Sequence, residues 1–264
     1  GTDTSTAEFA GRQRLMVEAL HPRQMQLRVA EVLDETASTR TLRLERQDGV
    51  LPPFRPGQYV NLFVEIDGVR TSRPYSISSA PGAAHMDLTV REKPGGFVSP
   101  YLVREVAAGD RFVSTGPTGH FFHEPLIHGT DRVFLAGGSG ITPFMSMLRD
   151  QQQRGWPLSV TLLVGTRKPS DVIFGDELRQ MARATDRLTL AVVVSDPAPS
   201  FRGRRGLLDA ARIREEVGEV AGQTFYLCGP NPMLELCRSA LAELGVPRQR
   251  IRAELFGAPD DVCQ

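Results

Sequence analysis

A short segment in the first half of the chain brings three kinds of side-chain chemistry together. Arg73, Tyr75 and Ser76 offer a guanidinium, an aromatic ring and a hydroxyl at neighbouring positions. A guanidinium can donate two parallel hydrogen bonds to a phosphate, and a tyrosine ring suits a flat heteroaromatic ligand. In a strand, Arg73, Tyr75 and Ile77 share one face, with Ser76 and Ser78 on the other unless a bend re-aims them. The segment favours an aromatic ligand that carries phosphate; the alternative is an exposed arginine beside a half-buried tyrosine.

A glycine pair forms a second candidate site. Gly95 and Gly96 precede Phe97, Val98 and Ser99, and we expect a helix to begin here with Ser99 as its cap. Glycine lets backbone amides approach a ligand closely, and the first turn of a helix presents unpaired N–H groups to anions. The segment predicts a phosphate cradle, against the alternative of an ordinary turn with a serine cap.

A third candidate site lies between an apolar strand and a helix. The strand runs directly into Gly137, Gly138 and Gly140, and Pro143 falls in the first turn of the expected helix. Strand, glycine turn and helix in this order are typical of a dinucleotide-binding fingerprint, here with proline in place of the last glycine.

A late strand ends in a fourth candidate turn, formed by Cys228, Gly229 and Pro230. Ligands of open α/β sheets lie beyond the carboxyl ends of the strands, so this turn should face the same crevice as Gly138 and Gly140. The alternative for Cys228 is a small, buried apolar side chain.

The elements that would position these residues are of two kinds. A closed antiparallel β-barrel of Greek-key type is predicted by six short segments rich in β-branched residues: 27–35, 39–47, 58–66, 73–79, 86–92 and 110–117. A doubly wound parallel sheet is predicted by the strands 131–138, 158–165, 188–195 and 224–229, which alternate with helices at 143–155, 171–184, 206–217 and 232–245.

We therefore expect two domains behind a leading segment. The predicted divisions are a helical extension over residues 1–24, the barrel over 25–128 and the α/β domain over 129–264. Residues 7–20 predict a short amphipathic helix, with a solvated tail as the alternative.

Composition excludes several classes of protein. The 264 residues are 41% hydrophobic and 23% charged, which is ordinary for globular domains and argues against disorder. The 31 basic and 31 acidic residues cancel, so no overall field attracts nucleic acid or an anionic membrane. The longest segment without charge lies between Arg132 and Arg149, shorter than the roughly 20 residues of a membrane-spanning helix. We expect neither a nucleic-acid partner nor membrane insertion.

Metal and disulfide chemistry are not expected either. The cysteines are Cys228, Cys237 and Cys263, none of them in a C-x-x-C pair, and the five histidines lack ligand spacing. Three cysteines cannot hold a four-cysteine iron–sulfur cluster. The low cysteine count makes the cytoplasm the expected compartment.

The four motifs together resemble those of the ferredoxin–NADP reductase superfamily. The order and approximate spacing are similar over about residues 26–257, in the segments Arg73-x-Tyr75-Ser76, Gly95-Gly96-x-x-Ser99, Gly138-x-Gly140-x-x-Pro143 and Cys228-Gly229-Pro230. Within that superfamily the chain looks like bacterial reductases that feed oxygenases. The resemblance implies a barrel that binds FAD, with FMN as the alternative, and an α/β domain that binds NADPH or NADH.

On the flavin side, the resemblance implies a role for each residue. Arg73 would contact the flavin phosphate, Tyr75 would pack on the isoalloxazine ring, and Ser76 would hydrogen-bond near flavin N5. Main-chain contacts to the flavin would come from Thr89, Val90 and Arg91. The phosphate would be held by the Ser99 hydroxyl and by the backbone amides of Gly96, Phe97, Val98 and Ser99.

On the nucleotide side, the resemblance implies a second set of contacts. The pyrophosphate would be received by Gly138, Gly140, Ile141, Thr142 and Pro143. The ribose or phosphate side would be lined by Thr166 and Arg167, and the same crevice would be bordered by Gly229 and Pro230. Cys228 would lie close to the site of hydride transfer. Phe256, after Glu254 and Leu255, would return toward the flavin, with an apolar strand ending as the alternative.

The implied activity is that of a flavoprotein reductase. It would take hydride from NAD(P)H onto FAD and pass electrons singly to an iron–sulfur or other protein acceptor. The alternatives are a free-flavin or ferric reductase and a non-catalytic sensor or regulatory electron-transfer subunit.

Two finer expectations concern the second cofactor and the acceptor. A preference for NADPH is predicted from Arg202, Arg204 and Arg205, which follow Ser195 after the third α/β strand; the alternative is a solvated basic loop. Residues 257–264 are linker-like, so we expect the source polypeptide to continue into a 2Fe–2S domain with a C-x4-C-x2-C segment. The alternative is a two-domain enzyme that reduces a separate ferredoxin or flavodoxin.

Overall fold

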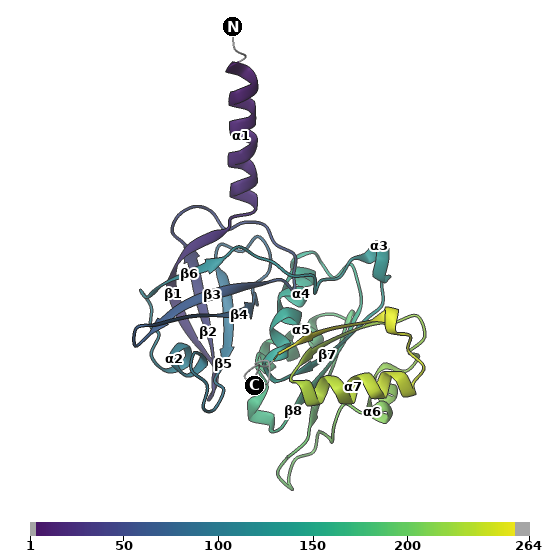
Figure 1. Cartoon of the computed structure of the whole chain (residues 1–264). Helices are drawn as coiled ribbons and strands as arrows, with labels where there is room; N and C mark the ends of the chain where they lie inside the picture. Colours follow the sequence, from purple (N-terminus) through teal and green to yellow (C-terminus); the bar gives the residue numbers. More distant parts are fainter. Residues whose placement is uncertain (1–3, 257–264) are drawn as a thin grey trace, which may run out of the picture.

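The computed structural model describes residues 4–256; Cys263 and the expected linker at 257–264 lie outside this range. Helix α1 (Thr4–Leu20) precedes the barrel and stands away from the rest of the molecule (Figure 1). Its side chains from residue 7 onward are exposed, Phe9, Met16 and Leu20 among them. The helix expected over residues 7–20 is therefore present, and no other described element packs along it.

The first domain is an antiparallel barrel, as expected. Its strands are β1 (Gln24–Thr36), β2 (Thr39–Arg46), β3 (Tyr59–Ile66), β4 (Val69–Ser76), β5 (Met86–Arg91) and β6 (Arg111–Thr115). They are ordered β4-β3-β6-β1-β2-β5, a Greek-key arrangement. Alternate side chains fill the interior, and the short helix α2 (Ser99–Arg104) adds Leu102 and Val103 to the same core.

The barrel closes at a single point. Ile77, just beyond β4, bridges Leu88 of β5, and the Ser78 N–H donates to the Asp87 carbonyl at 2.9 Å. β5 pairs with β2 along its whole length, but beyond Leu88 its other edge has no ladder partner among the described residues. This free backbone edge lies next to the end of β4.

The second domain is a parallel sheet with helices on both faces, also as expected (Figure 1). The connection from the barrel includes helix α3 (Pro125–His128). The strands are β7 (Arg132–Gly137), β8 (Val160–Thr166), β9 (Leu188–Val194), β10 (Arg204–Arg205), β11 (Thr224–Gly229) and β12 (Ile251–Leu255). The helices are α4 (Ile141–Gln153), α5 (Gly175–Ala184), α6 (Ala210–Val217) and α7 (Asn231–Glu243), with 3₁₀ turns η1 (Gly138–Gly140), η2 (Pro169–Asp171) and η3 (Arg248–Arg250).

The strand order β10-β9-β8-β7-β11-β12 places a topological switch point between β7 and β11. The chain runs from β7 outward to β9 and then returns to the other side of β7, so the connections leave this edge in opposite directions. α4 and α5 cover one face through Phe144 and Leu178, and α6 and α7 cover the other through Ile213 and Leu241. The two glycine turns, after β7 and β11, both open at the switch point.

Several element boundaries differ from the expected ones. The strand predicted over residues 73–79 runs instead from Val69 to Ser76, because the serines that follow turn toward β5: the Asp87 N–H donates to the Ser79 hydroxyl at 3.0 Å. Helix α6 begins later than predicted, where the Asp209 side chain accepts the Arg212 N–H at 2.9 Å. β10 and β12 extend the sheet beyond the four predicted strands.

No helix within residues 4–256 has an apolar stretch long enough to cross a membrane. Across the same residues, no group of three or more His, Cys, Asp or Glu side chains is arranged to hold a metal ion.

Candidate functional site

Strand β4 carries the first candidate residues to the place where the barrel closes. Arg73 is exposed, and its Nη1 donates to the Thr71 hydroxyl at 2.7 Å and to the Ser72 carbonyl at 2.8 Å. Within residues 4–256, no carboxylate pairs with this guanidinium. Arg73 therefore keeps its positive charge available at the barrel surface, as a phosphate contact requires.

Tyr75 and Ser76 lie deeper than Arg73. Tyr75 packs against the barrel core, and burial raises the pKa of its phenol to about 12, so the ring stays neutral. Ser76 is buried, and its Oγ has no hydrogen-bond partner among the described residues. A buried, unpaired hydroxyl is costly unless a further group satisfies it, so Ser76 fits a ligand with a hydrogen-bonding edge.

Two side chains near the end of β5 are already engaged. The Thr89 hydroxyl lies 2.8 Å from that of Thr41 and 2.9 Å from that of Ser78, and Val90 belongs to the barrel core. At these two residues, only the free backbone edge beyond Leu88 is left for a ligand. Main-chain contacts from residues 89–91 to a flavin stay a prediction.

The Gly95–Ser99 loop corrects one expectation. Ser99 is the first residue of α2 and not its cap: the cap position is Val98, without a side-chain cap hydrogen bond. The Ser99 hydroxyl instead accepts the Lys93 N–H at 2.8 Å and thereby closes the loop on itself. Gly95 has a φ of +72°, a conformation that favours glycine, and Phe97 is exposed beside the loop whereas Val98 is buried. The hydroxyl still has its own proton to donate.

The turn after β7 is shaped by backbone proximity. A Cβ on Gly140 would collide with the carbonyl of Cys228, so the β7 and β11 turns lie directly against each other, as expected. Gly138 has a φ of +54° and, with Ser139, is partly exposed. The side chains that follow, those of Ile141, Thr142 and Pro143, are buried beneath the turn. Only the backbone of this segment faces outward.

The side chain of Arg91 is a candidate that the sequence reading missed. Its Nη1 lies 2.6 Å from the position that a Cβ on Gly138 would occupy, so a barrel arginine reaches over the glycine turn of the other domain. No hydrogen bond or ion pair of this guanidinium occurs within residues 4–256. An unpaired cation at a glycine turn suits a pyrophosphate. Arg91 is the last residue of β5, and nothing in the sequence signalled its contact with Gly138, because the two residues lie 47 positions apart in the chain.

A buried carboxyl faces the β11 turn. Cys228 is fully buried, and burial raises the pKa of its thiol well above the usual value, so the thiol stays protonated. Glu254 of β12 pairs with it in the strand register, and burial raises the pKa of that carboxyl to about 7. The Glu254 Oε2 has no partner among the described residues. The available sequence signal was an acidic residue between the apolar residues Ala253 and Leu255.

Phe256 lies next to the same turn. Its N–H donates to the Gly229 carbonyl at 2.8 Å, and its ring is half-buried against the core of the α/β domain. Pro230 is exposed and caps helix α7, and Met233 packs over Gly229. Glu254 and Phe256 therefore lie at the β11 turn, whereas Ser76 lies at the end of β4.

The three arginines from which an NADPH preference is predicted differ in how far their side chains are already paired. Arg204 forms an ion pair with Glu216, and Arg205 donates to three loop carbonyls, including that of Phe201 at 2.7 Å. Arg202 is exposed, without a hydrogen bond or ion pair in the part of the chain described. The three therefore do not form a free cluster, because Arg204 is paired with helix α6 and Arg205 with its own loop.

The remaining predicted positions lie along the ends of β8 and β9. Arg167 pairs with Asp196 at 3.6 Å, and the Thr166 hydroxyl donates to the Lys168 carbonyl at 3.2 Å. Ser195 is exposed after β9, with its hydroxyl 3.4 Å from the Thr166 carbonyl. These side chains lie at the carboxyl edge of the sheet, on the side of β7 away from β11.

Two family models match the chain, one for each domain. An oxidoreductase FAD-binding domain matches residues 24–123, and an oxidoreductase NAD-binding domain matches residues 134–239. Together they cover the barrel and most of the α/β domain.

Characterised relatives and a solved structure agree with this assignment. Ferredoxin–NADP reductase B of Sorangium cellulosum is 37% identical over 225 residues, which covers 82% of this chain and 91% of the relative. The ferredoxin reductase component of 3-ketosteroid-9-alpha-monooxygenase from Mycobacterium tuberculosis is 34% identical over 250 residues, covering 90% of this chain and 67% of that longer protein. The FAD/NAD-binding domain of nitric oxide dioxygenase from Vibrio cholerae superimposes with a TM-score of 0.81 at 26% identity, covering 89% of this chain and 99% of that one.

Proposed function

The chain belongs to the ferredoxin–NADP reductase superfamily as an NAD(P)H-dependent flavoprotein oxidoreductase, and from this premise we propose that it passes electrons singly to an iron–sulfur protein or domain. The relatives named as ferredoxin reductases and as an oxygenase reductase component support that acceptor class. The same proposal places the enzyme in the cytoplasm.

The observation that carries the proposal is the unpaired Ser76 hydroxyl at the closure of the barrel. It lies at the end of β4, beside the free edge of β5. A buried hydroxyl next to unpaired backbone groups suits the polar edge of a flavin ring, whereas a purely apolar ligand would leave all of them unsatisfied.

When bound, the flavin accepts a hydride (two electrons and one hydrogen nucleus) from NAD(P)H, which is left oxidised, and it releases the electrons one at a time. The chain's own residues bind and orient. Arg73 would hold the flavin phosphate together with the Gly96–Ser99 backbone, Tyr75 would lie against the ring, and Ser76 would fix its polar edge. Phe256, which belongs to the α/β domain, would exclude water from the flavin ring.

The α/β domain would hold the pyrophosphate of the nicotinamide cofactor. The exposed backbone at Gly138 and Ser139 and the Arg91 guanidinium face the same place, which suits a ligand with two negative groups. Glu254 would hold a proton on its carboxyl below about pH 7 beside the neutral Cys228 thiol, so this part of the site adds little negative charge.

A groove on the barrel supports FAD over FMN. It has a volume of about 730 Å³ and is lined by Phe63 and Tyr101 together with Thr71 and Ser72, which hydrogen-bond Arg73. Aromatic walls beside a phosphate contact suit an adenine. Cofactor released by heat and separated by chromatography should be FAD.

An absorption spectrum followed by anaerobic titration tests the proposal. The purified protein should be yellow and should bleach with NADPH or NADH. It should reduce ferricyanide directly, and cytochrome c only after a ferredoxin is added. Colourless protein that oxidises NAD(P)H only with added flavin would identify a free-flavin reductase and contradict the proposal.

A further inference from the structure

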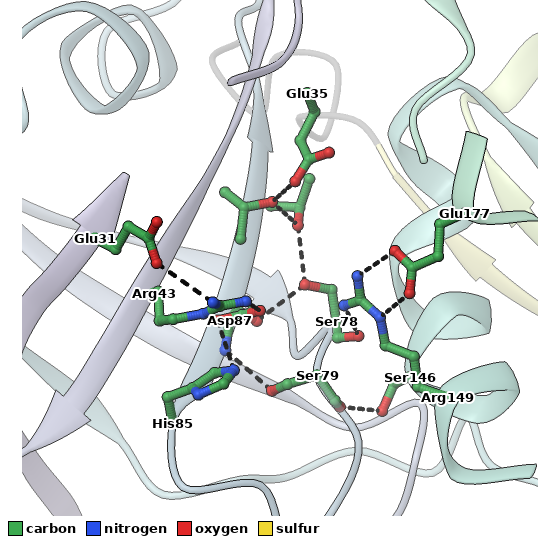
Figure 2. Close-up of polar contacts among 12 residues, drawn as sticks. Glu31, Glu35, Arg43, Ser78, Ser79, His85, Asp87, Ser146, Arg149 and Glu177 are labelled. Carbon is green, nitrogen blue, oxygen red and sulfur yellow. Dashed lines mark hydrogen bonds and ion pairs between the residues drawn. The ribbon is translucent and has the colours of Figure 1, made fainter. Parts of the chain in front are cut away.

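The segment after β4 is held from both sides. On the barrel side, the Ser78 N–H and the Ser79 hydroxyl bond to Asp87, as described above. On the other side, the carbonyls of Ser78 and Ser79 point to helix α4 of the α/β domain (Figure 2). The segment that begins two residues beyond Ser76 is therefore one of the places where the two domains touch through defined hydrogen bonds.

Two side chains of α4 make this contact. The Ser146 hydroxyl donates to the Ser79 carbonyl at 2.7 Å, and the Arg149 Nη1 donates to the Ser78 carbonyl at 2.8 Å. Positions 146 and 149 are three apart and share one face of the helix. Ser146 is fully buried, so the contact is not a fluctuating surface bond.

Arg149 is oriented by its own domain before it reaches the barrel. Its Nε and Nη2 donate to the two carboxylate oxygens of Glu177 at 2.9 and 2.8 Å, a bidentate pair, and its guanidinium lies 4.9 Å from the Phe174 ring centroid. A bidentate pair fixes the plane of a guanidinium and therefore the direction of its Nη1, the group that donates to the barrel. We call Ser146, Arg149 and Glu177, with the carbonyls of Ser78 and Ser79, the interdomain clasp.

The clasp joins the two cofactor-binding segments by a short, stiff path. α4 begins at Ile141, directly after the Gly138–Gly140 turn, and Arg149 lies near its middle. Ser78 follows Ser76 by two residues. The rate of reaction between two bound groups falls steeply when one of them is misplaced by as little as about 1 Å. A link between these two segments is therefore placed where it sets the distance between the cofactors.

We propose that Arg149 is a positioning residue for hydride transfer: oriented by Glu177, it holds the glycine turn of the nucleotide domain in register with the flavin strand. The proposal rests on the proposed function, because it assumes that NAD(P)H reduces a flavin bound at Ser76. It assigns Arg149 no contact with either cofactor.

The experiment compares Arg149→Met with a matched control, Arg179→Met. Arg179 pairs with Asp176 at 2.7 Å on the exposed surface of α5 and makes no bond to the barrel. In stopped-flow measurements at saturating NAD(P)H, Arg149→Met should reduce its flavin about 10- to 100-fold more slowly than wild type. Flavin content and the dissociation constant for oxidised nicotinamide cofactor should stay within about threefold of wild type. The control should match wild type throughout.

A second readout needs no cofactor. In the apoprotein, amide hydrogen exchange in peptides covering residues 77–90 should be faster in Arg149→Met than in wild type, because the barrel segment loses its outer support. Arg179→Met should leave this exchange unchanged. If wild-type protein failed to react with NAD(P)H, the proposed function would fail. The exchange comparison would still test whether Arg149 supports the barrel segment.

Two conservative variants keep the proposal testable if Arg149→Met does not fold. Arg149→Lys can still donate to the Ser78 carbonyl but cannot make the bidentate pair, and Glu177→Gln keeps Arg149 but loosens its orientation. Both should reduce flavin more slowly than wild type, with normal flavin content. Wild-type reduction rates in these variants, or a loss of flavin that parallels the loss of rate, would overturn the proposal.

Discussion

In the barrel, the candidate phosphate contacts include two side chains, Arg73 and Ser99, beside the Gly96–Ser99 backbone, whereas in the α/β domain the corresponding turn depends on the lack of side chains at Gly138 and Gly140. Arg73 is exposed and paired only with neighbouring oxygen atoms. Gly140 lies against the backbone of the β11 turn with no room for one further carbon. A contact made by a side chain can be weakened by degrees, but a contact that depends on backbone proximity fails as soon as an atom is added.

The largest effect should come from Gly140→Ala. The new Cβ would collide with the Cys228 carbonyl, which is backbone and cannot rotate away. We expect the free energy of unfolding to fall by about 3 kcal/mol, the upper part of the range for overpacking, and the rate of flavin reduction by NAD(P)H to fall sharply. Urea denaturation and stopped-flow reduction measure the two effects.

Gly11→Ala is the matched control, because nothing lies within 4 Å of a Cβ there. It should leave the rate unchanged and should not lower the free energy of unfolding, because alanine favours the helix at this position. If Gly140→Ala behaved in the same way, the contrast between the two kinds of phosphate site would be lost.

Arg73→Ala should have the next largest effect and should act on the flavin alone. Loss of a charged hydrogen-bond partner weakens binding by about 1–3 kcal/mol, so flavin should dissociate during gel filtration while the fold remains. The measurement is the ratio of absorbance at the flavin band to that at 280 nm. Arg14→Ala, which removes an exposed partner of Glu18 on helix α1, should retain its flavin. Equal flavin content in both variants would contradict the role of Arg73.

Glu254→Gln tests whether a buried side chain beside the β11 turn affects the stability of the α/β domain. Burial raises the pKa of Glu254 from 4.5 to about 7 in the folded protein. Folding favours the neutral form of the Glu254 carboxyl. The contribution of this carboxyl to the free energy of unfolding is therefore fully present below pH 4.5 and is lost as the pH rises through about 7. The free energy of unfolding of wild-type apoprotein should therefore fall between pH 5 and pH 8 relative to Glu254→Gln. Parallel pH profiles would show that the carboxyl is solvated and not a buried group of the site.

The smallest effect is expected at Arg202. Arg204 is paired with Glu216 of α6 and Arg205 with its own loop, so Arg202 is the residue left to meet a 2′-phosphate. Arg202→Ala should lower kcat/KM for NADPH by about fivefold and leave the value for NADH unchanged, as for an exposed charge contact worth about 1 kcal/mol. Equal losses with both cofactors, or a wild-type preference for NADH, would argue that the basic loop is only solvated.

Local chemistry explains why so much of the fold could be predicted. The β-branched segments of the barrel and the strand–helix alternation after residue 129 are properties of neighbouring residues, and the strands at Met86–Arg91 and Thr224–Gly229 were expected almost to the residue. The glycine turns were recognisable because only certain residues permit their backbone shape. The strand at β4 was misplaced, because its start and its end depend on pairing with β3 and on the serines that turn toward Asp87.

The sequence by itself determined the two kinds of domain, the four motifs and their order, since each depends on residues within one turn or one strand. The tertiary structure alone decided that Arg91 reaches Gly138, that Glu254 lies beside Cys228, and that Arg204 is occupied by Glu216. It also decided that Arg149 meets Ser78, 71 residues earlier in the chain. Such contacts have no local signature, because whether a charged side chain remains free or is buried with a partner depends on which distant segment folding brings to it.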